Sequence, residues 1–475
     1  MSNTPDLSRR KVLRRAAAVG LLATPAASFL AACATGGDDT KSGDTGVAKT
    51  PTNPFGMKED STVEVVIFNG GYGEKYATDS HEPNFKKAWP KATIKHSSTQ
   101  EISTVLQPRF AAGNPPEFVN NSGTKSMDFG ALVNDGQLAD LTDLWAAPSV
   151  DDPNKKVSES VVAGTVDVGS FNGKPFVLYY VSTVFGLWYS GKLFTDKGWT
   201  APTTWDDFLA LCAKIKAAGI TPYGYAGKNA AYYQWNVILT HAAKIGGGDI
   251  LKNIDNLEDG AWKADAVKQA AEAWGSLVGK GYIDKAFEGL IHTEVQLQQN
   301  QYKLGFYPSG DWLENEQAKT TPADFKYQLA AIPSLSSSDK LPATAIRATA
   351  GEGYFVSAKA PNVAGGKEYM RQMLSKASGR GFTEVVKSAT VVSGAADGFA
   401  FPPGVASSQA ALGAAGKDVV NIFFDGWYKD LDQEARAATN ELMFGRLDAA
   451  GFCDRIQKKA DAIKADSSIT KFKRN

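Results

Sequence analysis

Between residues 62 and 123, short apolar runs alternate with segments whose apolar positions recur at helical spacing. The runs 62–70, 92–98 and 117–123 predict buried strands, and the first ends in the turn signal Asn-Gly-Gly. Between them, 82–90 and 101–113 predict two helices. Strands separated by single short helices are typical of βαβ units, so we expect an open, mostly parallel sheet.

A longer apolar run, 176–199, predicts a strand that leaves one lobe and enters another. The region 190–325 is mostly helical in pattern, with predicted helices at 203–219, 234–247, 264–281 and 293–301, and a strand at 302–310. Residues 326–334 are interpreted as a return strand, after which the strand 351–360 and the helix 365–379 resume the first pattern, before a helical tail from about 395. We therefore expect two discontinuous α/β lobes, 61–182 with 335–392 and 183–334 with 393–475, hinged near 181–189 and 326–334.

Three polar loops follow the first three predicted strands. In open parallel sheets, ligands bind outside the carboxyl ends of the strands. This rule selects the loops 69–73, 98–101 and 120–123 as parts of a binding site.

The N-terminus has the pattern of a bacterial export signal. Arg9 and Arg10 precede a short apolar run, 16–30, and the sequence Leu-Ala-Ala-Cys then ends at Cys33. The paired arginines resemble a twin-arginine signal, and the last four residues resemble a lipobox, whose cysteine is lipidated. We expect residues 1–32 to be removed, Cys33 to carry the lipid, and 33–60 to form a flexible tether to the outer face of the cell membrane. An ordinary secretory signal that happens to precede a cysteine is the alternative.

Charge and composition exclude several classes of protein. Lys and Arg together number 51, as do Asp and Glu together. Removal of residues 1–32 takes away more basic than acidic residues. The slightly acidic remainder disfavours nucleic-acid binding. The hydrophobic fraction of 43% indicates a globular chain, and 475 residues exceed what one core usually supports.

Two further cysteines, Cys212 and Cys453, lie in predicted helices. In an exported protein this pair could form a disulfide. Two buried thiols that pack as small apolar side chains are the other interpretation. The sequence leaves both open.

Motifs for catalysis or metal binding are not evident. The four histidines show no metal-ligand spacing, and neither a G-x-S-x-G turn nor a P-loop motif is present. The stretch 255–262 resembles a calcium loop, but Leu257 and Ala266 replace oxygen ligands. We expect no metal, no cofactor and no enzymatic activity. A glycosidase needs only two carboxylates, however, so a lipid-anchored glycosidase remains the alternative.

Several stretches together resemble a known family. The chain resembles the solute-binding proteins of carbohydrate ABC importers, the group typified by maltose-binding protein. The resemblance rests on features that occur in the same order: the lipobox and tether, the Asn-Gly-Gly turn, the segment 172–199 before Pro-Thr-Thr-Trp, and Leu-Gly-Phe-Tyr-Pro-Ser-Gly-Asp-Trp at 304–312. A narrower resemblance is to the chitin-sugar-binding lipoproteins of actinobacterial importers, which bind N-acetylglucosamine or N,N′-diacetylchitobiose. It rests on residues 106–123, 132–144, 255–268, 310–325 and 390–395.

The resemblance implies a two-lobed periplasmic-binding-protein-like fold of type II, a clamp that closes on a sugar. It also implies a monomer that delivers sugar to two membrane permease subunits served by a cytoplasmic ATPase. A related chitooligosaccharide or a different oligosaccharide would fit the same class. The turn at 69–73 lacks the acid-lysine pair of maltose-binding protein, which argues against maltodextrins and leaves room for an acetamido group.

Residues expected to contact the sugar follow from the resemblance. Flat aromatic rings suit the C–H face of a pyranose, and carboxylates and amides suit its hydroxyls. The expected contacts are Gly71, Tyr72, Glu101, Asn121, Ser122, Thr183, Tyr232, Tyr233, Trp312, Glu352, Trp427 and Tyr428.

Each expected contact has a plainer interpretation. Aromatic residues are more often core than ligand contacts, and we assign Trp235 and Trp274 to the core. For Trp312 and Trp427, neighbouring Gly and Asp residues argue against burial. Glu101 could instead be a favourable acid at a helix start, and Glu352 a solvated loop charge.

Overall fold

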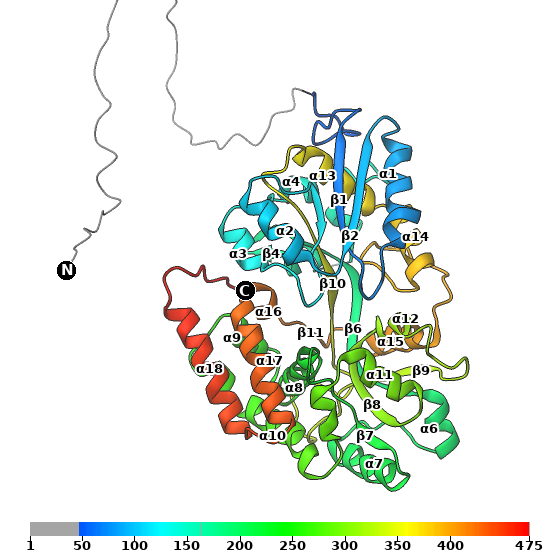
Figure 1. The fold of residues 1–475 in the computed structure, drawn as a ribbon, viewed down its shortest axis with the longest axis vertical. Coiled ribbons are helices and arrows are strands. Elements are labelled where there is room, and N and C mark those ends of the chain that lie inside the picture. Colours follow the sequence, from blue (N-terminus) through cyan, green and yellow to red (C-terminus); the bar gives the residue numbers. More distant parts are fainter. Residues whose placement is uncertain (1–46, 163, 475) are drawn as a thin grey trace, which may run out of the picture. The chain divides into compact units, whose positions relative to one another are not determined.

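The computed structural model describes residues 47–162 and 164–474 (Figure 1). The predicted signal peptide, Cys33 and the tether up to residue 46 lie outside this part of the chain. The predicted α/β class is confirmed, because strands and helices alternate along the described residues. Within these residues, no helix combines the length and the apolar character that crossing a membrane requires.

The main sheet follows the order β2-β1-β3-β10-β6-β8-β7, with β11 added to β10 and β9 added to β6. The predicted βαβ start is confirmed, since β1 pairs in parallel with both β2 and β3. The strands are β1 (Thr62–Phe68), β2 (Thr93–Thr99), β3 (Phe118–Asn120), β6 (Leu178–Ser190), β7 (Thr221–Tyr223), β8 (Leu304–Gly310), β9 (Tyr327–Ala330), β10 (Ile346–Val356) and β11 (Val419–Val420), while β4 (Ser170–Phe171) and β5 (Lys174–Pro175) form a separate hairpin.

Two long strands connect the two ends of this sheet. β6 and β10 pair antiparallel from Arg347↔Phe185 to Tyr354↔Leu178, and β10 pairs with β3 at one end and β11 at the other. The predicted crossing at 181–189 therefore lies inside an unbroken strand. The predicted return crossing at 326–334 is wrong, because β9 pairs only with β6 and the strand that returns is β10. The strand predicted at 351–360 corresponds to the second half of β10, and the mixed polar sequence of residues 346–350 gives no apolar pattern that predicts the first half.

Helices cover the sheet in two groups, which we call the first and second lobes (Figure 1). The first lobe contains β1–β3 with α1 (Glu82–Ala88), α2 (Ile102–Ala111), α3 (Phe129–Asn134), α4 (Thr142–Ala146), α5 (Thr165–Val168), α13 (Val363–Met373) and α14 (Lys376–Val386). The second lobe contains β7–β9 with α6 (Gly191–Lys197), α7 (Trp205–Ala217), α8 (Ala231–Gly246), α9 (Asp249–Asp255), α10 (Asp265–Gly279), α11 (His292–Asn300), α12 (Leu313–Glu316), α15 (Pro403–Ala415), α16 (Phe424–Trp427), α17 (Lys429–Met443) and α18 (Ala449–Ala465).

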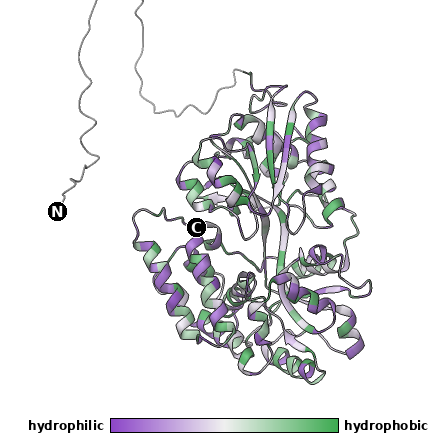
Figure 2. Ribbon diagram, viewed as in Figure 1, coloured by the Kyte–Doolittle hydropathy of each residue, from purple (hydrophilic) through white to green (hydrophobic). Residues whose placement is uncertain are grey.

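Local chemistry explains where many helices begin. The side chains of Ser190, Thr204, Ser375 and Asp448 accept hydrogen bonds from backbone N–H groups in the first turns of α6, α7, α14 and α18. Such N-caps satisfy donors that the helix itself cannot, which contributes about 1 kcal/mol each. The hydropathy colouring shows the resulting helices with polar and apolar sides (Figure 2).

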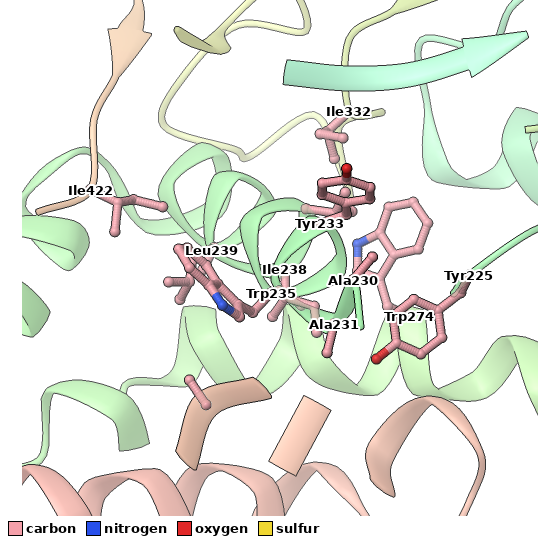
Figure 3. Packing of buried hydrophobic residues seen from close by; sticks show 14 of the residues in the cluster. Tyr225, Ala230, Ala231, Tyr233, Trp235, Ile238, Leu239, Trp274, Ile332 and Ile422 are labelled. Carbon is pink, nitrogen blue, oxygen red and sulfur yellow. The ribbon is translucent and has the colours of Figure 1, made fainter. Parts of the chain in front are cut away.

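The core of the second lobe is built around α8, which is buried along most of its length. Figure 3 shows Trp235, Ile238 and Leu239 of this helix among other apolar side chains, with Tyr233 directed toward Ile332. Trp235 and Trp274 are both fully buried, so the core assignment of these two residues is confirmed.

The end of the predicted tether is folded rather than free. Phe55 and Met57 are buried in the core of the first lobe. The Asn53 side chain holds this turn, donating to the Met57 carbonyl at 2.9 Å and accepting from the Met57 N–H at 2.8 Å. The expectation that the tether extends to residue 60 is therefore wrong, since apolar burial fixes residues 53–57.

Cys212 and Cys453 are both free and buried, so the structure does not form the disulfide that the sequence left open. Burial raises the pKa of the Cys453 thiol to about 12 and raises that of Cys212 further. A thiol that stays protonated reacts slowly. In protein that lacks Cys33, we expect Cys212 and Cys453 of the native state to resist a thiol-specific reagent at pH 8. Once the protein is unfolded in urea, both thiols should react. Rapid native labelling, or a shift in melting temperature on adding a reductant, would contradict this expectation.

Candidate functional site

Trp312 packs against both hydrophobic clusters of the structure, one confined to the first lobe and one that extends through both lobes. Its centroid is 5.4 Å from that of Phe185 and 5.7 Å from that of Tyr233, and its indole N–H donates to the Tyr233 hydroxyl at 3.3 Å. Trp312 is only partly buried, as its neighbouring Gly and Asp led us to expect. The ring is therefore placed to form a wall shared by both lobes.

The loop after β1 reaches the same place from the first lobe. The Asn315 side-chain amide of α12 donates to the Gly71 carbonyl at 2.9 Å, which links the two lobes directly. Tyr72 is 8% exposed and its ring lies edge-on to Phe382, with centroids 6.0 Å apart. Burial raises the pKa of Tyr72, and the nearby carboxylates of Asp311 and Glu352 raise it further.

Glu352 comes from β10 and has a positive φ of 55°, a strained conformation for a residue with a side chain. Its carboxylate accepts from the Asn120 side chain at 3.1 Å. The Ser122 hydroxyl accepts from the same amide and from the Gly353 N–H, each at 3.1 Å. Glu352 is half-buried within β10 and its carboxylate is hydrogen-bonded, which argues against the alternative of a solvated loop charge, and burial raises its pKa.

Asp311 adds a second carboxyl, 1% exposed, directly before Trp312. Its Oδ2 accepts weakly from Ser408 at 3.4 Å, while Oδ1 forms no hydrogen bond. Burial raises the pKa of Asp311 to about 7. Thr183, from the crossing strand β6, is 2% exposed and lies close enough to the Tyr72 hydroxyl to affect its pKa.

Tyr232 and Tyr233 form an aromatic pair at the start of α8, with centroids 4.3 Å apart. The guanidinium of Arg436 lies 4.5 Å above the Tyr232 ring and is held by Asp432 through two hydrogen bonds of 2.8 and 2.9 Å. Tyr233 and Phe185 also line a cavity of about 10 Å³, which is room for one water, together with Gly186, Asn236, Val237, Thr240, Ser309 and Ile332.

A further charged pair, Arg347 and Asp425, lies beside this aromatic wall. Arg347 is 4% exposed and stacks 4.1 Å from the Phe185 centroid, with Asp425 Oδ2 4.0 Å from its Nη2. Burial lowers the pKa of Arg347 to about 10 and raises that of Asp425. Two nitrogens of Arg347, Nε and Nη1, have no hydrogen-bond partner. No pattern in the sequence indicates Arg347, because the predicted strand 351–360 begins after it.

The aromatic pair of α16 is placed differently from our expectation. Trp427 is 6% exposed and Tyr428 is 3% exposed, so the expectation that Asp425 and Gly426 keep Trp427 out of the core is wrong. Trp427 stacks on Phe423 at 5.5 Å and contacts Phe472 at 5.9 Å. The Tyr428 hydroxyl accepts from the Phe472 N–H at 2.8 Å. The side chains of Trp427 and Tyr428 therefore pack against the C-terminal segment.

The side chains of two other expected contacts are engaged by nearby residues outside the group around Trp312. Glu101 is exposed and precedes α2, where its carboxylate accepts from the Thr104 hydroxyl at 3.2 Å. Both ends of the Asn121 amide are used by the Met127 backbone, at 2.7 and 3.0 Å. The structure thus brings together Gly71, Tyr72, Ser122, Thr183, Tyr232, Tyr233, Trp312 and Glu352, and it adds Asn120, Asp311, Asn315 and Asp425, which the sequence did not single out.

This group has the composition of a site for a polar, uncharged ring rather than for a metal. It combines aromatic faces with amides, hydroxyls and carboxyls, which match the C–H face and the hydroxyl rim of a sugar. Across the described ranges 47–162 and 164–474, no cluster of three or more His, Cys, Asp or Glu side chains could hold a metal ion.

Comparison with known proteins places this site in a family. The model of the bacterial extracellular solute-binding protein family matches residues 72–380. The chain is 36% identical over 476 residues to the diacetylchitobiose binding protein NgcE of Streptomyces coelicolor, covering 98% of each chain. It is 22% identical to the multiple sugar-binding protein of Streptococcus mutans, covering 81% of this chain and 86% of that protein.

Solved structures show the same fold. A chitin oligosaccharide binding protein aligns with a TM-score of 0.69 at 19% identity, covering 85% of this chain and all of the other. A protein from a study of xylan utilisation aligns with a TM-score of 0.69 at 17% identity, covering 84% and 99%. The chain belongs to the bacterial extracellular solute-binding protein family and has its two-lobed α/β fold. The resemblance inferred from sequence motifs is thereby confirmed.

Proposed function

We propose that this protein binds an amino sugar, N-acetylglucosamine, N,N′-diacetylchitobiose or a related chitooligosaccharide, outside the cell and delivers it to an ABC importer. The observation that carries the proposal is the 36% identity to a diacetylchitobiose binding protein over nearly the whole of both chains. The alignment covers 98% of each chain and therefore extends over both lobes and the strands between them.

The site supports the same ligand class on physical grounds. Trp312 and Tyr232 offer aromatic faces to the pyranose ring, and stacking of this kind contributes about 0.5–1.5 kcal/mol beyond area burial if aromatic-pair values apply. Tyr72, Ser122 and Glu352 offer hydroxyl and carboxyl groups to the sugar's polar atoms. A site built for an acetamido group rejects a sugar that leaves its buried polar atoms unpaired, at about 1–3 kcal/mol for each.

The partners and the location follow from the same proposal. Two permease subunits with an ATPase would receive the sugar from a monomer held outside the cell through lipidated Cys33. The two lobes would close around it by bending at β6 and β10, the strands that connect them, so the boundary expected at 334–335 moves into β10.

Calorimetric titration against four sugars tests the proposed function. We expect N-acetylglucosamine and diacetylchitobiose to bind, and maltose and cellobiose not to bind, because the latter two lack the acetamido group. Binding of maltose or cellobiose with equal affinity would contradict the amino-sugar assignment.

A lipid-anchored glycosidase is the second candidate, since the site contains two carboxyl groups, on Asp311 and Glu352. Incubation with diacetylchitobiose followed by mass spectrometry separates the two candidates. A binding protein returns the sugar intact, whereas the appearance of N-acetylglucosamine would establish hydrolysis.

A further inference from the structure

We propose that residues 470–474 form a strap between the two lobes, which favours the arrangement of the lobes in which the candidate sugar site is assembled. In addition to the hinge strands β6 and β10, this segment links the lobes through side-chain contacts that can be released. The proposal rests on the proposed function where sugar binding is its measure, and it concerns how the lobes are held rather than which sugar binds.

The strap is anchored to the second lobe by hydrogen bonds. The Asn256 side chain, at the end of α9, accepts from the Arg474 N–H at 2.7 Å and donates to its carbonyl at 3.0 Å. The Arg474 guanidinium donates to Asp255 at 2.9 Å. The Tyr428 hydroxyl accepts from the Phe472 N–H at 2.8 Å. These bonds fix the backbone of the strap to α9 and to the start of α17, so the strap moves with the second lobe.

The contact of the strap with the first lobe is made by side chains. The Phe472 ring lies edge-on to that of Phe171, with centroids 4.9 Å apart, and both side chains are 3% exposed. Phe171 lies in β4, which follows α5 of the first lobe. The Thr470 hydroxyl donates to the side-chain oxygen of Asn134 at the end of α3. An aromatic pair and a hydrogen bond therefore hold the strap to the first lobe, and both break when the lobes move apart on this side.

A direct contact between the lobes lies beside the strap. Gly130 of α3 packs so closely on α16 that a β-carbon there would lie 2.3 Å from the Trp427 carbonyl oxygen. The Lys429 side chain donates to the Ser126 hydroxyl at 3.3 Å. The Phe472 ring also contacts Trp427 at 5.9 Å, and Figure 1 shows the C-terminus beside α16. The strap therefore adds to an interface that exists only while α3 and α16 stay together.

The same arrangement of the lobes assembles the candidate site. The Asn315 amide of the second lobe donates to the Gly71 carbonyl of the first lobe at 2.9 Å, three residues after Trp312. Contacts that one arrangement makes and another lacks raise the population of the first, and a ligand that needs this arrangement then binds more tightly. Loss of the strap contacts should therefore weaken sugar binding.

Two variants test the aromatic pair. Phe171→Leu and Phe472→Leu each remove one ring and keep an apolar side chain. We expect each to weaken binding of N,N′-diacetylchitobiose about threefold to tenfold, because an edge-on aromatic pair is worth about that much. The double variant should lose no more than the larger single loss, since the two rings act through one contact. Calorimetry measures the affinity, and stopped-flow fluorescence should show that dissociation becomes faster.

Phe110→Leu is the matched control, because Phe110 is also a buried phenylalanine of the first lobe with an edge-on partner, Phe355, at 6.0 Å. This variant should bind diacetylchitobiose as wild type does. Melting temperatures identify a ring variant that fails to fold. In that case the other ring variant decides, together with Thr470→Val, which removes the hydrogen bond to Asn134 and should also weaken binding.

Small-angle scattering without sugar separates this proposal from the proposed function. Phe171→Leu and Phe472→Leu should have a larger radius of gyration than wild type, and Phe110→Leu should not. If the ring variants keep the wild-type radius, or bind diacetylchitobiose equally or more tightly, the strap is wrong and the proposed function stands. Equal weakening by Phe110→Leu would assign the effect to lost stability and also overturn the strap. If wild type binds no amino sugar, the proposed function fails and the radii alone decide on the strap.

Discussion

Replacing Trp427 with alanine is expected to lower the free energy of unfolding by about 3–5 kcal/mol, the usual cost of removing a buried Trp side chain. The ring is 6% exposed, stacks on Phe423 and contacts Phe472, so its removal leaves a cavity between α16 and the C-terminal segment. Urea denaturation followed by circular dichroism measures the loss, and an unchanged slope with denaturant shows that the comparison is valid.

Trp199→Ala is a matched control, because Trp199 is also a tryptophan that packs against an aromatic ring, that of Phe194, but it is only partly buried. Trp199→Ala should lower the free energy of unfolding by clearly less than Trp427→Ala does. If Trp427→Ala instead leaves stability unchanged and weakens sugar binding more than tenfold, the ring is a sugar platform, as its sequence context indicated.

Replacing Asp311 with asparagine is expected to make the protein more stable at pH 8 and to reduce the dependence of stability on pH. The pKa of Asp311 rises from 3.8 to about 7 on folding, so the folded state holds a proton that the unfolded state releases between these values. Wild-type stability therefore falls as the pH rises from about 4 to 7. At 1.36 kcal/mol per pKa unit, this fall is at most about 4 kcal/mol, and asparagine, which cannot ionise, avoids it.

Urea denaturation of both proteins between pH 4 and pH 8 measures this effect. Asp255, whose pKa burial also raises to about 7, titrates in the same range and should keep part of the slope in the variant. At pH 4 the two proteins should be about equally stable. An Asp311→Asn curve parallel to that of wild type across the whole range would show that Asp311 is ionised in the folded protein.

The sequence predicts the start of the first lobe well because its signals there are local. The strands and helices between residues 62 and 113 alternate in short units with clear turn residues, and β1, β2, α1 and α2 lie where expected. The first half of the return strand β10, residues 346–350, escapes prediction because Arg347 and Thr349 interrupt its apolar pattern, while pairing with β6 stabilises it. Such pairing depends on residues more than 150 positions away in the chain.

The sequence predicts the candidate-site residues that belong to one short motif. It does not predict those that distant segments of the chain bring together. Trp312 follows Gly310 and Asp311 in one recognisable stretch, and it packs against both hydrophobic clusters. Trp427 has similar neighbours, but Phe472, 45 positions later, covers its ring, and no local pattern reveals that contact. Arg347 and Asp425 likewise come together only through tertiary packing.

The C-terminal segment also determines where other molecules can be attached to this protein. Phe472 packs on Phe171 of the first lobe at 4.9 Å, while the Asn256 side chain of the second lobe holds the backbone of Arg474 at 2.7 and 3.0 Å. A purification tag or fluorescent partner fused after these residues would start beside the contact between the lobes and could hold them apart or together. A dye on an exposed residue of α7, such as Asp206, would leave that contact undisturbed and is the safer choice for a biosensor.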